Sequence, residues 1–116
     1  MFSLGSTHRY YLYGAFCDMR KSFDGLCGLV RNELGREPSN GDVYVFINKR
    51  KTHLKLLHWQ SGGFVLYYKR LSEGQFVLPS SGLGAGYLSW SDLVLLIEGL
   101  WVSKLKAEPR YVIPRV

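Results

Sequence analysis

The chain has few of the residues that usually mark a catalytic or metal-binding site. Nine residues lie between its two cysteines, Cys17 and Cys27, and this distance matches no zinc-binding spacing. The three histidines, His8, His53 and His58, show no metal-binding spacing either, because an odd separation puts the last two on opposite sides of one strand. Neither a GxSxG motif nor a phosphate-binding P-loop is present. The sequence therefore indicates a protein that is not an enzyme and that needs no metal or other cofactor.

Long apolar runs and a secretory signal are also missing. The first residues, MFSLGSTHRYYLY, lack the basic start and the apolar stretch of a signal peptide. The longest apolar stretch is far shorter than the roughly 20 residues that cross a bilayer as a helix. We therefore expect a reducing, cytoplasmic location and no membrane partner, with Cys27 as a buried thiol on a helix.

Acidic residues are scarce relative to basic ones. Nine Asp and Glu oppose 15 Lys and Arg, which gives a formal net charge of +6. A basic excess raises affinity for nucleic acid, acidic proteins and anionic membranes alike, so it does not choose among them. Hydrophobic residues make up 47% of the chain and aromatic residues 15%, which is enough to form the core of one domain of 116 residues.

Hydrophobic periodicity and turn residues divide the chain into strands and helices. Apolar residues at helical spacing predict a helix that begins at Asp18 or Ser22 and ends at Gly35. A second helix is predicted over residues 90–100, with Ser89 and Asp92 as a capping box. Strands are predicted over residues 8–16, 43–48, 53–60, 64–71 and 75–78, and a loop over residues 80–86.

This order of elements predicts an α+β fold, with an antiparallel meandering sheet of four to five strands and two packed helices. We expect residues 1–101 to form a single domain. Residues 102–116, which carry further prolines and charge, are expected to form a C-terminal arm or a frayed tail.

The turns fix which residues share a face of the sheet. Turns over residues 49–52 and 61–63 place Asn48 opposite His53 and Gln60 opposite Phe64. One face is then mostly aliphatic, and we expect the first helix to cover it. The other face mixes aromatic rings with Lys55 and Lys69, directly opposite each other, although like charges in this position are mildly destabilising.

A face of this kind suits nucleic acid, where bases stack on rings and phosphates pair with cations. It also suits a protein interface, where rings anchor the partner and charges surround them. A third possibility is that the second helix covers this face and the lysines reach its edge.

Basic residues occur in three further places that favour a nucleic-acid surface. The candidates for phosphate contacts are Arg20, Lys21, Lys49, Arg50, Lys51, Lys55, Lys69 and Arg70, and those for stacking or anchoring are Tyr44, Trp59 and Tyr67. Each group has a simpler alternative. The turn over residues 49–51 can be a solvated turn that protects a sheet edge, and Asp18 can pair with the cations beside it. The acidic residues Asp18, Asp24, Asp42 and Glu98 have no spacing that indicates a metal site.

The second helix is apolar nearly all round, because Glu98 is the only charge over residues 93–100. Such a helix must be covered on several sides. It is either enclosed within this chain or it meets a partner, so homo-oligomer formation through this helix is open.

Several segments together resemble a known family. They are DMRKSFDGL, VYVFINKRK, HLKLLHWQSGGFVLYYKRLSEGQFVLP and DLVLLIEG, in this order over about residues 7–100. This set is similar to the TnpB-type accessory protein of bacterial insertion sequence family sixty-six, the product of its second open reading frame. The resemblance implies a bacterial, cytoplasmic helper in DNA transposition, a form of DNA recombination, encoded beside a separate transposase that carries the catalytic site. It implies no catalytic residue in this chain.

Three functional hypotheses follow. The leading one is a transposition accessory protein that binds DNA, or a transposase–DNA complex, through a basic aromatic surface. The second is an adaptor that binds only the transposase, through the apolar second helix at Leu93 and Ile97. The third is a small ribonuclease of the toxin type, because such proteins are also small, basic and α+β.

Overall fold

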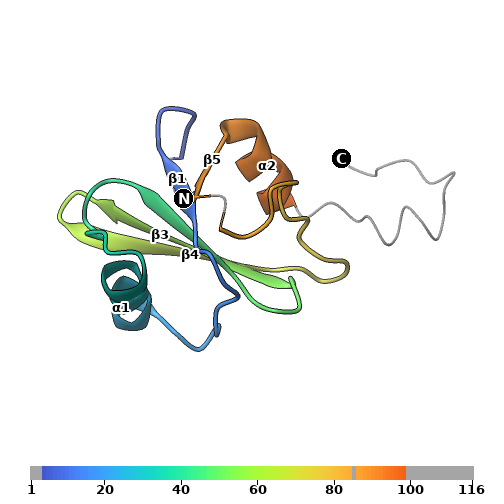
Figure 1. Cartoon of the computed structure of the whole chain (residues 1–116), viewed down its shortest axis with the longest axis horizontal. Helices are drawn as coiled ribbons and strands as arrows, with labels where there is room; N and C mark the ends of the chain where they lie inside the picture. Colours follow the sequence, from blue (N-terminus) through green and yellow to red (C-terminus); the bar gives the residue numbers. More distant parts are fainter. Residues whose placement is uncertain (1–3, 85, 99–116) are drawn as a thin grey trace, which may run out of the picture.

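The computed structural model describes residues 4–84 and 86–98, which form one five-stranded sheet and two helices. The elements in chain order are β1 (Tyr10–Leu12), α1 (Phe23–Glu33), β2 (Val43–Ile47), β3 (His53–Gln60), β4 (Gly63–Arg70), β5 (Gly86–Leu88) and α2 (Trp90–Glu98). Across the sheet the strands follow the order β4, β3, β2, β1, β5 (Figure 1). The predicted α+β fold is confirmed, but the sheet is mixed rather than a simple antiparallel meander.

The difference begins at the first strand. β1 is parallel to β2, with Tyr10 paired to Val43, and α1 forms the crossover that a parallel pair requires. The strand predicted over residues 8–16 is wrong beyond Leu12. The chain still follows β2 there, because the N–H of Cys17 donates to the carbonyl of Ile47 at 2.8 Å. The antiparallel meander is therefore limited to β2, β3 and β4.

Two further segments differ from the prediction. Residues 86–88 form β5, which is antiparallel to β1 and pairs Tyr87 with Tyr11. The prediction ended a loop at residue 86 and placed no strand there. The strand predicted over residues 75–78 is absent from the described sheet. The N–H of Phe76 instead donates to the carbonyl of Lys51 at 2.7 Å, and a contact with a turn gives no strand ladder.

The register of the two hairpins decides which side chains share a face. In the β2–β3 hairpin Asn48 lies opposite His53, as predicted, with their backbones joined by a 3.2 Å hydrogen bond. In the β3–β4 hairpin Gln60 pairs with Gly63, one residue earlier than predicted. Ser61 and Gly62 both have positive φ, 51° and 83°, which is the two-residue turn that matches the twist of a hairpin.

This shift of one residue moves every side chain of β4 to the other face. Lys55 lies opposite Tyr68, while Lys69 lies opposite Leu54. The prediction that Lys55 and Lys69 face each other on one surface is therefore wrong. The two lysines lie on opposite faces of the sheet.

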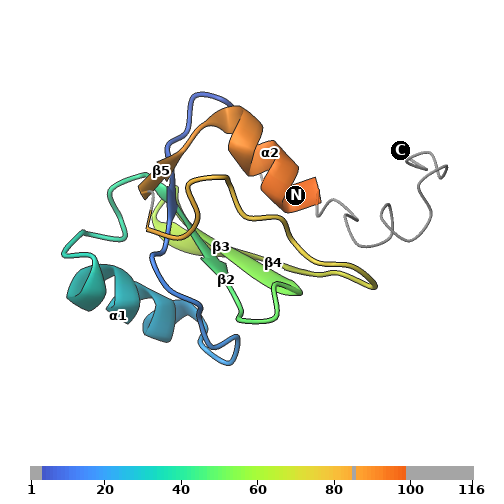
Figure 2. The same ribbon diagram turned by 45° about the vertical axis from the view of Figure 1, so that its right-hand side comes forward.

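Each face of the sheet carries a buried core and is covered by one helix, although no residue of β4 is fully buried (Figure 2). The first helix covers the aromatic face, where Tyr44, Phe46 and Leu57 are fully buried. The aliphatic face, with Val45 and Leu56, packs against α2. The prediction that the first helix covers the aliphatic face is wrong, because both faces are apolar enough to be buried and hydrophobicity alone does not assign a helix to either.

The helix ends agree with the sequence in part. The hydroxyl of Ser89 accepts a 3.1 Å hydrogen bond from the N–H of Asp92, so Ser89 caps α2 as predicted. The first helix is preceded by Ser22, not Asp18, and ends before Gly35, whose φ of 63° favours glycine. No helix within the described residues is long and apolar enough to cross a bilayer. The tail predicted over residues 102–116 lies outside the described residues.

A buried histidine gives a prediction on acid stability. His58 is buried, its Nδ1 has no hydrogen-bond partner, and its ring lies 5.0 Å from that of His8. Burial, together with the charge of His8, lowers the pKa of His58 below its usual 6.5. As the pH falls below about 6.5, His58 is therefore protonated in the unfolded chain while it is still neutral in the folded chain.

We expect the free energy of unfolding to decrease as the pH falls from 7.5 to 5.5, by at most about 1.4 kcal/mol per pH unit from this group. Urea titrations across this range measure it. His58→Gln should flatten the dependence, because it removes the buried imidazole. An equal slope in the wild type and His58→Gln would contradict the assignment to His58.

Candidate nucleic-acid interface

Three segments meet at the end of the sheet where β2 turns into β3. They are the loop over residues 16–21 before α1, the turn over residues 49–51, and the open end of the β3–β4 hairpin, far from its turn, with His53, Tyr68 and Arg70. Lys51 lies over the ring of Phe16, with its Nζ 5.9 Å from the ring centroid. We call this region the turn-end surface, and it contains most of the basic residues predicted as phosphate contacts.

Lys55 is the centre of this region, but it does not lie on its surface. Its side chain is only 5% exposed, and its Nζ donates to the carbonyls of Met19 at 2.8 Å and Lys21 at 2.6 Å. The same ammonium lies 4.5 Å from the ring centroid of Tyr68. Its predicted place on an exposed phosphate-binding face is therefore wrong. Lys55 fixes the loop that leads into α1 against the sheet.

The backbone of the β2–β3 turn is held from two sides. The side-chain oxygen of Asn48 accepts hydrogen bonds of 2.9 Å from the N–H groups of Thr52 and His53. On the outer side, Gln75 donates from its side-chain amide to the carbonyl of Arg50 at 2.8 Å. The side chains of Lys49 and Arg50 stay exposed while their backbone is fixed. Two cations are thus presented to solvent from a fixed turn.

An open cavity of about 210 Å³ lies beside the turn, lined by His53, Tyr68 and Arg70. Arg70 pairs with His53 across the hairpin, and Tyr68 lies two residues before Arg70 on the same face of β4. The rings of His53 and Tyr68 are 6.0 Å apart, and the Tyr68 side chain is 53% exposed. The cavity therefore combines an exposed ring with an exposed cation.

Arg20 and Lys21 differ in how far their charges are available. The guanidinium of Arg20 donates hydrogen bonds from two of its nitrogens to the carboxylate of Asp18, and the shortest is 2.6 Å. These bonds, followed by one from the backbone N–H of Arg20, lower the pKa of Asp18 to about 2. The alternative that Asp18 pairs with a neighbouring cation is confirmed for Arg20. The Lys21 side chain is exposed, and the backbone carbonyl of the same residue accepts the hydrogen bond from Lys55.

The remaining predicted residues lie elsewhere. Tyr44 is fully buried beneath α1, and Tyr67 packs against the aliphatic core. Trp59 contacts Phe64 at the opposite end of the hairpin, with ring centroids 4.9 Å apart. Lys69 donates from its Nζ to the carbonyl of Ile97 at 2.8 Å and so caps the end of α2. The structure does not bring these four residues to the turn-end surface.

The aromatic residues that do reach this surface are Phe16, His53 and Tyr68, none of which the sequence analysis selected. The signal for Tyr68 was present in the Ser61-Gly62 pair. A two-residue turn at this pair would have placed Tyr68 and Arg70 on the face that carries Lys55. Phe16 had no such signal, because its position depends on an irregular segment that follows β1.

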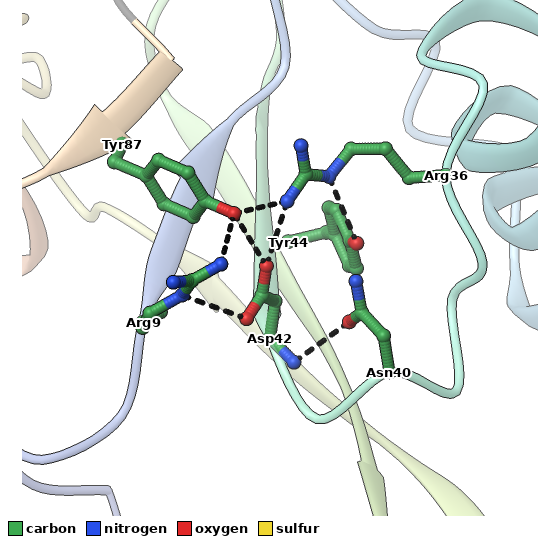
Figure 3. Close-up of polar contacts among 6 residues, drawn as sticks. All are labelled: Arg9, Arg36, Asn40, Asp42, Tyr44 and Tyr87. Atoms are coloured by element: carbon green, nitrogen blue, oxygen red, sulfur yellow. Dashed lines mark hydrogen bonds and ion pairs between the residues drawn. The ribbon is translucent and has the colours of Figure 1, made fainter.

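A second polar cluster surrounds Asp42, just before β2 (Figure 3). Arg9 and Arg36 both form ion pairs with this carboxylate, at 3.4 and 3.0 Å, and the Tyr87 hydroxyl contacts it at 3.0 Å. The guanidinium of Arg36 lies 4.5 Å from the ring centroid of Tyr11, and that of Arg9 lies 4.5 Å from the ring of Tyr87. Asp42 is only 6% exposed. Through its contacts with Arg9, Arg36 and Tyr87, the cluster ties β1, β2, β5 and the segment after α1 together.

The other chemistry-bearing residues are accounted for by packing. Cys17 and Cys27 are buried and unpaired, and burial raises the pKa of both thiols, so neither is set up as a nucleophile. Within the described parts of the chain, no three His, Cys, Asp or Glu side chains are grouped to hold a metal ion.

Asp42 gives a prediction on stability. Asp42→Asn would keep the size of the side chain but leave Arg9 and Arg36 without their anion, so we expect a loss of about 2 kcal/mol in the free energy of unfolding. Arg9→Gln should have a smaller effect, because the Arg9 side chain is 66% exposed. Urea denaturation measures both. No measurable loss for Asp42→Asn would mean that the cluster does not stabilise the fold.

Comparison with known proteins places the chain in a family. A model described as "IS66 Orf2 like protein" matches residues 8–107. Two relatives are the uncharacterized proteins y4jC and y4hO of Sinorhizobium fredii, which are 35% identical over 92 residues and 34% identical over 101 residues. These matches cover 79% of this chain and of y4jC, and 86% of this chain and 87% of y4hO. No solved structure matches the chain. The chain therefore belongs to the IS66 Orf2 family of transposition-associated accessory proteins.

Proposed function

We propose that this protein is a non-catalytic accessory factor that binds DNA during transposition through its turn-end surface. The observation that carries the proposal is the gathering of exposed cations and an exposed ring at one end of the sheet. Within residues 4–84 and 86–98, no carboxylate lies within ion-pair distance of Lys49, Arg50 or Arg70. These charges are therefore available to phosphate groups.

The proposed phosphate contacts are those cations that reach the surface, with the transposase–DNA complex as an equally suitable target. They are Lys21, Lys49, Arg50, Lys51 and Arg70, with Arg20 as a weaker contact because Asp18 offsets its charge. Lys55 supports this surface from below and makes no phosphate contact. The net charge of +6 favours the approach of a polyanion.

The salt dependence of binding tests this proposal. Each cation that neutralises a phosphate releases about one counterion, so affinity falls steeply with salt. Lys49→Gln combined with Arg50→Gln should lower the slope of log K against log salt by about 2 and weaken binding to any DNA sequence. Fluorescence anisotropy with a labelled fragment of the element's terminal repeat measures both quantities.

Arg31→Gln is the control for charge removal, compared with Arg50→Gln. Arg31 is also exposed, but it lies on α1 and pairs with Glu37 at 3.4 Å. The proposal predicts that Arg50→Gln weakens binding more than Arg31→Gln does. Equal effects, or no retention of the wild type on DNA at low salt, would overturn direct DNA binding through this surface.

A second candidate function, an adaptor that holds the transposase, is favoured by the outer side of α2. Trp90, Val94 and Leu95 are 41%, 37% and 49% exposed there, whereas Leu93 and Leu96 are buried in the core. An exposed apolar strip on a helix is a common contact for a protein partner. Leu93, expected as part of the partner contact, is core, so a charge at that position would unfold the protein.

Val94→Asp combined with Leu95→Asp should remove an adaptor contact without unfolding the chain. The adaptor hypothesis predicts that the wild type co-purifies with the transposase at both low and high salt and that this variant does not. Ser91→Asp is the control, because it adds a charge to the exposed side of α2 without removing apolar area. Retention of the transposase by the double variant would exclude this side of α2. Gel filtration of the same variants tests whether the strip joins two copies of the chain.

A further inference from the structure

We propose that the cavity formed by His53, Tyr68 and Arg70 holds one unpaired nucleotide of DNA, with the base on the Tyr68 ring and the phosphate on Arg70. The inference rests on the proposed DNA-binding function. It adds that the protein prefers DNA whose bases are not paired.

The Tyr68 ring is arranged as a platform. The ammonium of Lys55 lies over one face of the ring, 4.5 Å from its centroid, and is itself held by two carbonyls. Tyr68 is nonetheless 53% exposed and lines the open cavity, so part of its ring meets solvent. A ring that is held by a neighbouring ammonium and is still partly exposed can accept a planar group at little entropic cost.

The charges around the ring select the ligand. Arg70 lies two residues along β4, roughly 7 Å away on the same face. Its guanidinium has the planar, forked shape that matches a phosphate. His53 adds hydrogen-bonding capacity across the hairpin, and the cations of the turn over residues 49–51 extend the positive surface beyond it. A base followed by its phosphate fits this order of ring and cation.

The size of the cavity limits the ligand further. A volume of about 210 Å³ is below the roughly 300–1,000 Å³ of sites for whole cofactors, so it suits a single ring system. Duplex DNA does not offer such a ring, because its bases are stacked on each other. Proteins that bind single strands use exposed rings on a sheet with cations beside them, which is the arrangement found here.

The test compares a single-stranded oligonucleotide with a duplex of the same sequence, by fluorescence anisotropy on the full chain. Tyr68→Ala should weaken binding of the single strand by roughly 5- to 150-fold, the range expected for loss of one stacked base. Duplex binding should change less than twofold, and the salt slope should stay the same because no charge is removed. Tyr68→Phe should bind the single strand as the wild type does, and Tyr68→Leu should behave like Tyr68→Ala.

Trp90→Ala is the matched control, because it also removes an exposed ring but on α2, away from the cavity. Urea midpoints identify any variant that is unstable, and the comparison of Tyr68→Phe with Tyr68→Leu then decides the matter at nearly constant side-chain volume. A wild type that binds duplex as well as single strand, or a Tyr68→Ala variant that weakens both equally, would overturn this inference and leave the proposed function standing. Absence of any DNA binding would overturn both. Preference for RNA of the same sequence would overturn the assignment to DNA.

Discussion

The contact between Lys55 and Tyr68 across β3 and β4 is the feature on which the turn-end surface depends. From its place in the sheet, Lys55 contacts two segments that are distant in the sequence. Its ammonium binds the loop before α1 and lies over the exposed ring of Tyr68 on β4. Its place opposite Tyr68 follows from the Ser61-Gly62 turn. Had that turn contained one more residue, Lys55 would face Lys69, and the loop that carries Lys21 would face a second cation instead of a ring.

A buried ammonium needs strong hydrogen bonds to offset the loss of water. The carbonyls of Met19 and Lys21 supply them at 2.8 and 2.6 Å, and the face of the Tyr68 ring supplies a third favourable contact. Both partners are neutral, and among the described residues no carboxylate forms an ion pair with Lys55, so its charge is not cancelled there. It therefore adds to the positive potential of the surface above it even though it touches no ligand.

The sequence predicts well the elements whose ends are marked by local signals. β3 has the predicted ends, and the cap of α2 at Ser89 and the β2–β3 register follow from residues within each segment. The β3–β4 register could not be assigned in the same way, because Ser61-Gly62-Gly63 permits a loop of two or three residues. The parallel pairing of β1 with β2 depends on contacts between distant segments, which no local pattern encodes.

The same distinction explains which residues of the candidate site could be predicted from the sequence. Exposed cations in turns, such as Lys49 and Arg50, could be found from the sequence because turn residues lie on the surface. The exposure of strand residues could not be found in this way. Lys69 and Tyr67 were placed on the wrong face because the register of β4 depends on one turn. Lys55 is on the predicted face, but the loop before α1 covers it. Phe16 depends on a segment with no regular structure. Sequence reasoning thus identified the charge of the surface but not the rings that accompany it.

The two candidate functions use opposite sides of the molecule. Tyr68 and Arg70 lie on the face of the sheet that α1 covers, whereas Val94 and Leu95 are exposed on α2. The two helices lie on opposite sides of the sheet (Figure 2). A ligand on one side therefore need not displace a ligand on the other. The two proposed contacts are therefore compatible with each other. Salt separates the two contacts, because counterion release weakens the first and an apolar interface is little affected.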